Sequence, residues 1–301
     1  MAIAAAIVLL FGTVLLAIVG WRTAPDTADL AGRASLAARP QPAVPVGAIS
    51  ASLRDAVVAT EDERFYRHQG VDLVGILRAV PYDLAHLSLA QGASTITEQA
   101  AKVLYLNGND HSPGRKLRSV FIALRMESRH SKEQILAAYL NSVYFGEGAY
   151  GIRAASDRYF GVSSSRLTLA QASLLAGLIQ APSAYDPLLH PAEARSRQLH
   201  VLTSMVRNGY TTSPEAEGVL RHPLPMKNGA ALAPIPDATI IATPRVSESR
   251  LTWGLVLSAL SLCFLLLRRR LGIAPPWRIA GATGLLVGAL STVSATHHLV
   301  Q

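Results

Sequence analysis

Three long apolar stretches interrupt a chain whose remaining pattern is helical. Residues 1–21 carry no charged side chain, and residues 251–267 and 279–300 form two further apolar stretches. Since about 20 consecutive apolar residues are enough to cross a bilayer, the pattern predicts one N-terminal and two C-terminal transmembrane helices. A cleaved signal peptide is the competing interpretation of the first stretch. However, no basic segment precedes it, and it exceeds the usual apolar core of about 7–15 residues.

A short basic loop sets the expected orientation of these spans. Residues 268–278, between the last two spans, contain Arg268, Arg269, Arg270 and Arg278. Short loops rich in Lys and Arg remain in the cytoplasm. We therefore expect a multi-pass protein of the cytoplasmic membrane, with residues 22–250 on the extracytoplasmic side.

The segment 49–210 has the spacing of packed helices. Leu53, Ala56, Val57 and Thr60 recur three and four positions apart, and so do the apolar residues at positions 117, 120, 121 and 124. Residues 192–208 predict another helix, which Gly209 would end. The alternating pattern of a strand does not appear over any length. The expected fold class is therefore mainly α.

Capping signals and flanking composition set the expected boundaries. A hydroxyl residue followed three positions later by Glu or Gln predicts a capping box at a helix start. The pairs with this spacing are Thr95 with Glu98, Ser131 with Gln134 and Thr168 with Gln171. The flanking segments 22–48 and 211–250 contain many Pro and Ala residues, so we expect them to be extended connections to the membrane.

Composition and charge agree with a membrane protein. Half of the 301 residues are apolar and only 16% are charged, which is unusual for a cytosolic enzyme. The formal net charge is +8, and four of these charges come from the arginines of the loop 268–278. The other basic residues form no dense block with interleaved aromatic residues, so nucleic acid is not an expected partner. The single cysteine, Cys263, excludes an internal disulfide.

Adjacent carboxylates at the end of the first predicted helix are the first candidate site. Glu61 and Asp62 are followed by Phe65, His68 and Asp72. Paired carboxylates that are partly buried are suited to proton transfer. A solvated acidic helix end would have the same spacing.

Two further clusters suit an anion. One follows Gly92 at a predicted helix start and contains Ser94, Thr95, Thr97 and Gln99. Backbone N–H groups at such a start favour phosphate, although plain N-capping gives the same pattern. The other cluster contains the basic residues Lys102, Arg115 and Lys116. Fixed cations of this kind bind pyrophosphate, and a solvated basic face is the alternative. We find no metal-ligand motif, and the identity of any metal is left open.

Taken in order, these clusters resemble the peptidoglycan glycosyltransferase domain, glycosyltransferase family 51, of class A penicillin-binding proteins and monofunctional transglycosylases. The resemblance covers about residues 52–210. It rests on motifs that follow the family's order: Glu61-Asp62 with Phe65, His68, Gly70 and Asp72; Gly92 to Thr97; Arg115-Lys116; Ser131 to Leu136; Tyr139-Leu140-Asn141; Tyr144-Phe145-Gly146; Gly151-Ile152; Tyr159-Phe160-Gly161; and Leu167 to Pro182.

The resemblance implies a lysozyme-like glycosyltransferase domain at the outer face of the cytoplasmic membrane. It implies polymerisation of lipid II into β-1,4-linked glycan strands with release of undecaprenyl pyrophosphate, and Glu61 as the general base. The implied pyrophosphate-binding residues are Lys102, Arg115, Lys116, Ser94, Thr95, Thr97 and Gln99, and the residues supporting the first motif are Asp62, Phe65, His68 and Asp72. A divalent cation, Mg²⁺ or Mn²⁺, is also implied, without an organic cofactor. The implied partners are lipid II, a lipid-linked glycan chain, the membrane and cell-wall synthesis proteins.

The chain departs from the family where a second catalytic glutamate is expected. Four residues after Arg115 stands Ser119, which cannot carry the charge. The usual Thr-Gln-Gln of the second motif reads Thr97-Glu98-Gln99, so Glu98 is a possible substitute, although a capping box explains it more simply. Losing a group that stabilises transition-state charge commonly costs about 100- to 1000-fold in rate.

Three hypotheses follow from these residues. The first is a lipid II polymerase, and the second is a catalytically impaired lipid-binding scaffold or regulator of cell-wall synthesis. The third is a glycan hydrolase, which would need two carboxylates flanking a sugar bond. Glu61 and Glu98 are the pair that such a hydrolase would use.

Overall fold

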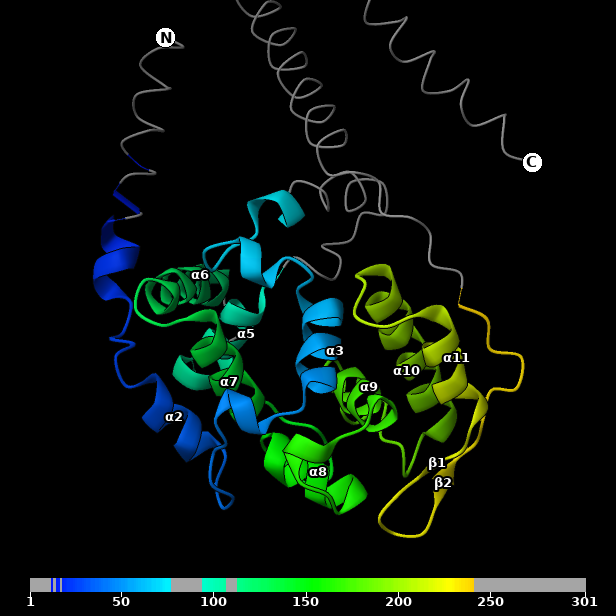
Figure 1. Cartoon of the computed structure of the whole chain (residues 1–301). Coiled ribbons are helices and arrows are strands. Elements are labelled where there is room, and N and C mark those ends of the chain that lie inside the picture. The colour runs from blue at the N-terminus through cyan, green and yellow to red at the C-terminus, as the bar shows by residue number, and fades with distance from the viewer. Residues whose placement is uncertain (1–11, 13–14, 17, 77–93, 107–112, 241–301) are drawn as a thin grey trace, which may run out of the picture. The chain divides into compact units, whose positions relative to one another are not determined.

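The computed structural model describes residues 12, 15–16, 18–76, 94–106 and 113–240, and the structural statements below concern these residues. They are mainly helical, as predicted (Figure 1). The helices are α2 (Leu30–Ala37), α3 (Ala51–Glu61), α5 (Ile96–Tyr105), α6 (Pro113–Glu127), α7 (Lys132–Ser142), α8 (Ile152–Phe160), α9 (Leu169–Leu178), α10 (Pro191–Arg207) and α11 (Ser213–Arg221). The 3-10 turns are η1 (Val46–Ala48), η2 (Phe65–Arg67) and η3 (Ser164–Arg166), and β1 (Leu224–Pro225) pairs antiparallel with β2 (Ala231–Leu232).

Helix α3 stands between two groups of helices. On one side, α5 packs against both α6 and α7, and α7 also packs against α2. On the other side, α3 packs against α9 and α10, which also pack against each other. The C-terminal end of α3 therefore lies where the two groups meet.

The core is built from helices with wide apolar faces. In α9, residues 172–178 are all buried, as expected for a helix that is apolar nearly all round. The predicted face of α3 is confirmed for Leu53, Ala56 and Val57, which are buried. Helix α10 begins and ends within one residue of its predicted bounds, and Gly209 after it has a positive φ of 76°.

Two of the three predicted capping boxes form completely. The Ser131 and Thr168 hydroxyls accept the backbone N–H groups of Gln134 and Gln171, and both glutamine side chains return the bond. At the start of α5, the Thr95 hydroxyl accepts the N–H of Glu98 at 3.1 Å. The Glu98 carboxylate bonds to Lys116 on α6 instead of closing the box. The predicted box of Thr95 and Glu98 is therefore wrong in its second half.

The two flanking segments are more ordered than their composition predicts. Within 22–48, Asp29 caps α2, which packs on α7, and the Asn141 side chain bonds both backbone groups of Val44 at 2.8 Å. Within 211–250, α11 and the β1–β2 hairpin bury Ala216, Leu220 and Leu224. The expectation of extended connections is wrong here, because specific caps and buried apolar residues attach both segments to the domain.

The buried face of α6 differs from the predicted one. The fully buried residues are Ser119, Ile122, Ala123 and Met126. Of the predicted set, Leu117 is 38% exposed and the residues at 120, 121 and 124 are half-buried. Both sets have helical spacing. The buried face of α6 contains the polar Ser119, so a pattern of apolar residues alone does not predict this face.

The predicted membrane spans fall almost entirely outside the described residues. This holds for all of 251–267, 268–278 and 279–300, and for 1–21 except residues 12, 15–16 and 18–21. Within the described ranges, no helix has both the length and the apolar character that crossing a bilayer requires.

Candidate active site

Glu61 lies on the wall of a cavity of about 580 Å³ where the two helix groups meet. It is the last residue of α3, so its side chain projects from a rigid element at the end of the helix. The cavity is lined by Thr60, Glu61, Ser94, Gln99, Gln180, Tyr185, Ser196, Arg197 and His200. Glu61 is the only carboxylate in this lining of described residues, whereas glycan hydrolysis would normally use two.

Two side chains hold the Glu61 carboxylate. Gln99 Nε2 donates to Oε2 at 2.9 Å, and the Arg197 guanidinium lies 3.6 Å from Oε1. The side chains of Glu61 and Arg197 are only 12% and 11% exposed. Burial lowers the pKa of Arg197 and the Glu61 charge raises it, but an arginine keeps its charge at neutral pH. The carboxylate is therefore both oriented and paired with a cation.

Gln99 is itself held by a buried tyrosine. The Tyr139 hydroxyl donates to Gln99 Oε1 at 2.7 Å, so both ends of the amide are used. Burial, and then the charge of Glu61, hold the pKa of Tyr139 well above its ordinary value. The hydroxyl therefore remains a donor at physiological pH. The result is a fixed chain of Tyr139, Gln99 and Glu61 that runs from α7 through α5 to α3.

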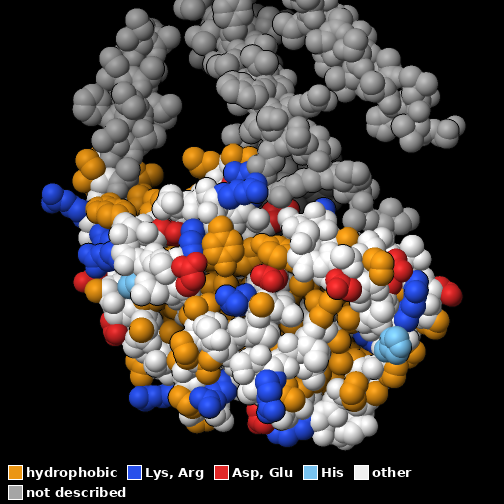
Figure 2. Space-filling view, in the orientation of Figure 1, with side chains coloured by type: hydrophobic (Ala, Val, Ile, Leu, Met, Phe, Trp, Pro, Cys, Tyr) orange, Lys and Arg blue, Asp and Glu red, His pale blue; other side chains and the backbone are white. Residues whose placement is uncertain are grey.

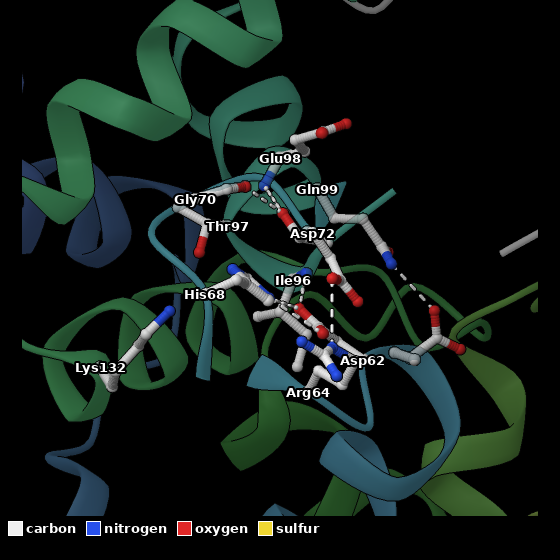
Figure 3. Close-up of polar contacts among 12 residues, drawn as sticks. Asp62, Arg64, His68, Gly70, Asp72, Ile96, Thr97, Glu98, Gln99 and Lys132 are labelled. Carbon is white, nitrogen blue, oxygen red and sulfur yellow. Dashed lines mark hydrogen bonds and ion pairs between the residues drawn. The ribbon is translucent and has the colours of Figure 1, made fainter. Parts of the chain in front are cut away.

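The rest of the first motif connects the turn after α3 to the start of α5. Asp62 is buried, and its carboxylate bonds His68 Nε2 at 2.9 and 3.0 Å and accepts the Ile96 N–H at 3.0 Å (Figure 3). The Thr95 hydroxyl donates to the Gly70 carbonyl at 2.6 Å, and Gly70 has a φ of 87° that favours glycine. These contacts fix the relative position of the first and second motifs.

Three other predicted residues lie around this turn. Asp72 Oδ1 accepts from Arg64 Nε at 3.2 Å. Thr97 donates to Glu127 Oε1 at 2.7 Å, and the same oxygen accepts from Lys132 at 2.6 Å. The Lys132 ammonium lies 4.5 Å from the ring centre of the fully buried Phe65. Asp72, Thr97 and Phe65 therefore contact structural partners and are absent from the cavity lining described above.

A basic cluster contacts Ser94, which lines this cavity, although the lysines themselves are not in the lining. Lys116 Nζ and Lys102 Nζ donate to Ser94 Oγ at 2.9 and 3.3 Å. Lys116 also pairs with the buried carboxylate of Glu98. Burial is the main cause that lowers the pKa of Lys102; the charges of Lys116 and Arg115 lower it further, and Glu98 opposes them. The predicted cations are therefore together, and next to the wall that holds Glu61.

Ser119 takes no part in this charge arrangement. Its side chain is fully buried, and its hydroxyl donates to the Lys116 carbonyl at 2.7 Å. Glu98 and Gln99 are neighbours on α5, but their side chains leave the helix in different directions (Figure 3). Gln99 faces Glu61, while Glu98 faces Lys116.

Sequence reasoning missed Arg197 and the other cavity residues of α10. Arg197 and His200 are three positions apart, so they lie on one side of a helix that also buries apolar residues, among them Leu202 and Met205. This basic pair on an amphipathic helix was the available signal. Among the described residues, no group of three or more His, Cys, Asp or Glu side chains could hold a metal ion.

Comparisons with known proteins show the family of this chain. The model of a protein family described as Transglycosylase matches residues 30–206, more than half of the chain. A Cupriavidus necator protein provisionally named a transglycosylase is 45% identical over 186 residues, which are 61% of this chain and 79% of that protein.

Similarity extends to parts of larger proteins. Penicillin-binding protein 1A of Neisseria flavescens is 42% identical over 172 residues, which are 57% of this chain but 21% of that protein. The chain thus matches about a fifth of the length of that relative. The crystal structure of penicillin-binding protein 1A from Haemophilus influenzae matches 44% of this chain and 16% of that one, with 27% identity and a TM-score of 0.31. On the family match and the relative of similar length, the chain belongs to the transglycosylase family, glycosyltransferase family 51.

Proposed function

We propose that the chain polymerises lipid II into β-1,4-linked glycan strands with release of undecaprenyl pyrophosphate. The observation that carries the proposal is the position of Glu61, a carboxylate held on the wall of a cavity whose lining residue Ser94 binds the basic cluster. Family membership supports a glycosyl transfer, and these residues supply the two groups that such a transfer needs.

The first group is a base for the acceptor hydroxyl. The 4-hydroxyl of the acceptor sugar forms the new C–O bond at the anomeric carbon of the donor, and its proton passes to Glu61. Gln99 and Arg197 restrict the carboxylate to one orientation. A fixed base of this kind contributes about 100- to 10,000-fold to a rate.

The second group stabilises the leaving pyrophosphate. The bond from the anomeric carbon to the pyrophosphate breaks, its electron pair leaves with the phosphate oxygen, and the configuration changes from α to β. Lys102, Lys116 and Arg115 supply positive charge for the oxygen that gains the negative charge. Preorganised charges act most strongly on the charge that develops in the transition state.

A divalent cation, Mg²⁺ or Mn²⁺, remains part of the proposal as a companion of the pyrophosphate. Mg²⁺ at phosphate sites usually takes phosphate oxygens and water, with one or two carboxylates. When bound, it would neutralise part of the phosphate charge. We assign no step of the transfer to it.

Membrane association also belongs to the proposal, because the substrate is a lipid. Several large apolar side chains are exposed, including Leu73 at 69%, Val103 at 46% and Leu117 at 38%, and Figure 2 shows apolar side chains on the face that it draws. Exposed apolar groups of this kind suit a lipid or membrane surface. With the spans predicted from the sequence, they support a multi-pass protein of the cytoplasmic membrane whose domain faces outwards, where it meets lipid-linked glycan chains and cell-wall synthesis proteins.

Ser119 favours a second candidate function, a lipid-binding scaffold or regulator without polymerase activity. The two functions separate in one experiment with detergent-solubilised protein, labelled lipid II and a divalent cation. We expect polymer from the parent and none from Glu61→Gln, with normal polymer from the matched control Glu193→Gln, whose side chain is exposed on α10. Lipid II binding without polymer from the folded parent would favour the scaffold.

A further inference from the structure

Among the described residues, the carboxylate that pairs with the basic cluster is Glu98, and it comes from α5. Helices α5 and α6 pack together, and the family's carboxylate position on α6 is occupied by Ser119, whose hydroxyl is bonded to a backbone carbonyl. Glu98 of α5 instead brings its carboxylate to Lys116. A negative charge is therefore present beside the lysines, although the expected position lacks one.

Helix capping does not require a charge at residue 98. The capping boxes of α7 and α9 form with glutamine at the same position of the helix, Gln134 and Gln171, whereas the box of α11 forms with Glu215. Glu98 uses its backbone N–H for the cap and leaves its side chain free for Lys116. A glutamine at position 98 would keep the cap and lose only the charge.

The Glu98 carboxylate is buried and only half used. The side chain is 1% exposed, one oxygen pairs with Lys116, and Oε1 is buried without a hydrogen-bond partner. Burying an ionised group with an open acceptor is unfavourable, and such groups are few in native proteins. An aliphatic or amide residue would cost less here if stability were the only requirement.

The charges around Ser94 leave a positive excess. Lys102 and Lys116 converge on one hydroxyl, the charge of Arg115 also acts on Lys102, and the Glu98 carboxylate pairs with Lys116. Among these four described residues, three positive charges face one negative charge, which suits an anionic ligand. Without Glu98 the lysines would repel each other, and the Lys116 side chain, already 51% exposed, could turn towards water.

We propose that Glu98 replaces the carboxylate that α6 lacks, as a positioning residue that fixes Lys116 and, through Ser94, Lys102 against the pyrophosphate of the donor. This inference rests on the proposed polymerase function. Glu98 pairs with Lys116 and is absent from the lining of the cavity that holds Glu61, so its removal should act on the leaving group. The base Glu61 keeps its own partners, Gln99 and Arg197.

The test compares Glu98→Gln, Glu98→Asp and the double variant Glu98→Gln/Ser119→Glu in lipid II polymerisation by the full chain. We expect kcat of Glu98→Gln to fall about 100-fold with KM changed less than about threefold, because the lost contact acts on transition-state charge. Glu98→Asp keeps the charge and should retain at least about ten times more activity than Glu98→Gln. The double variant returns a carboxylate to α6 and should recover part of the loss.

A matched control and a folding check separate this role from a structural one. Glu215 occupies the same position of α11, in a complete capping box with Thr212, and is exposed. Glu215→Gln should leave kcat unchanged. Thermal melting should show that Glu98→Gln is folded, and the comparison with Glu98→Asp holds even if Ser119→Glu, at a fully buried position, does not fold.

The outcomes distinguish this inference from the proposed function. If the parent makes polymer and Glu98→Gln stays within about threefold of it, or Glu98→Asp is as poor as Glu98→Gln, the role of Glu98 is overturned while the polymerase stands. If the parent makes no polymer, the proposed function fails first and the role of Glu98 fails with it.

Discussion

Tyr139→Phe removes one hydroxyl from the support of Glu61 and nothing else. The Tyr139 side chain is fully buried, and its hydroxyl donates to Gln99 Oε1 at 2.7 Å. In the variant, Gln99 loses one of its two partners, and the amide that donates to Glu61 at 2.9 Å becomes free to turn. The ring and its packing remain.

The expected magnitudes follow from one hydrogen bond. Losing it should cost about 1–2 kcal/mol of unfolding free energy, because the Gln99 oxygen is left without its donor. For a domain of roughly 150–250 residues this lowers Tm by about 2–8 °C. A loss of about 1 kcal/mol in the alignment of Glu61 corresponds to an about fivefold lower kcat.

The assay pairs thermal melting with the initial rate of lipid II polymerisation, and Tyr159→Phe is the matched control. Tyr159 is equally buried, and its hydroxyl donates to the Phe145 carbonyl at 3.0 Å, outside the lining of the cavity. We expect both variants to lose similar stability and only Tyr139→Phe to lose kcat. If kcat of Tyr139→Phe is unchanged, or if Tyr159→Phe lowers it equally, the chain from Tyr139 to Glu61 does not position the base.

Two further predictions concern the basic cluster and the first motif. Burial, Lys116 and Arg115 lower the pKa of Lys102 from its ordinary 10.5, and Glu98 opposes them. A lysine is charged below its pKa, so the polymerisation rate should fall as pH rises through this lowered value. The fall should come at higher pH in Lys102→Arg, and an identical alkaline limb in that variant would contradict the role of Lys102. Asp62→Ala leaves two buried donors, from His68 and Ile96, without their acceptor. The free energy of unfolding should fall by about 2–4 kcal/mol, and Tm should fall by at least about 5 °C. An unchanged melting curve would show that the link between the two motifs contributes little to stability.

Local patterns predicted the helices that depend on local rules. The bounds of α10, the buried face of α3 and the complete capping boxes at Ser131 and Thr168 follow from spacing and hydrogen-bond chemistry within a few residues. The same rules were ambiguous for α6, where two stripes have helical spacing. The buried set of residues contains the polar Ser119, so apolar spacing favoured the other set, which is half-buried or exposed.

Contacts between distant segments could not be read from spacing. Glu61 and the cations were predicted as separate clusters, and their approach through Ser94 depends on how α3, α5 and α6 pack. Arg197 reaches Glu61 from α10, which carried no catalytic motif. The flanking segments were mispredicted for the same reason, since the bonds of Asn141 to Val44 depend on the distant α7.

The same limitation applies to Glu98. Sequence spacing favoured a capping role, because the Thr95-to-Glu98 interval is that of a capping box. The packing of α6 places Lys116 within reach of the carboxylate, and a charge pair with a buried partner competes successfully with the return bond to the backbone. Tertiary contacts therefore decide that the Glu98 side chain pairs with Lys116 instead of completing the capping box.

The most direct test of the account is the formation of glycan polymer from labelled lipid II by the parent chain and by Glu61→Gln. Glu61→Gln keeps the size of the side chain and removes the base. We expect polymer from the parent and none above background from Glu61→Gln, with both proteins folded. Equal polymer from both proteins would contradict the assignment of Glu61 as the general base, and no polymer from the folded parent would contradict the polymerase itself.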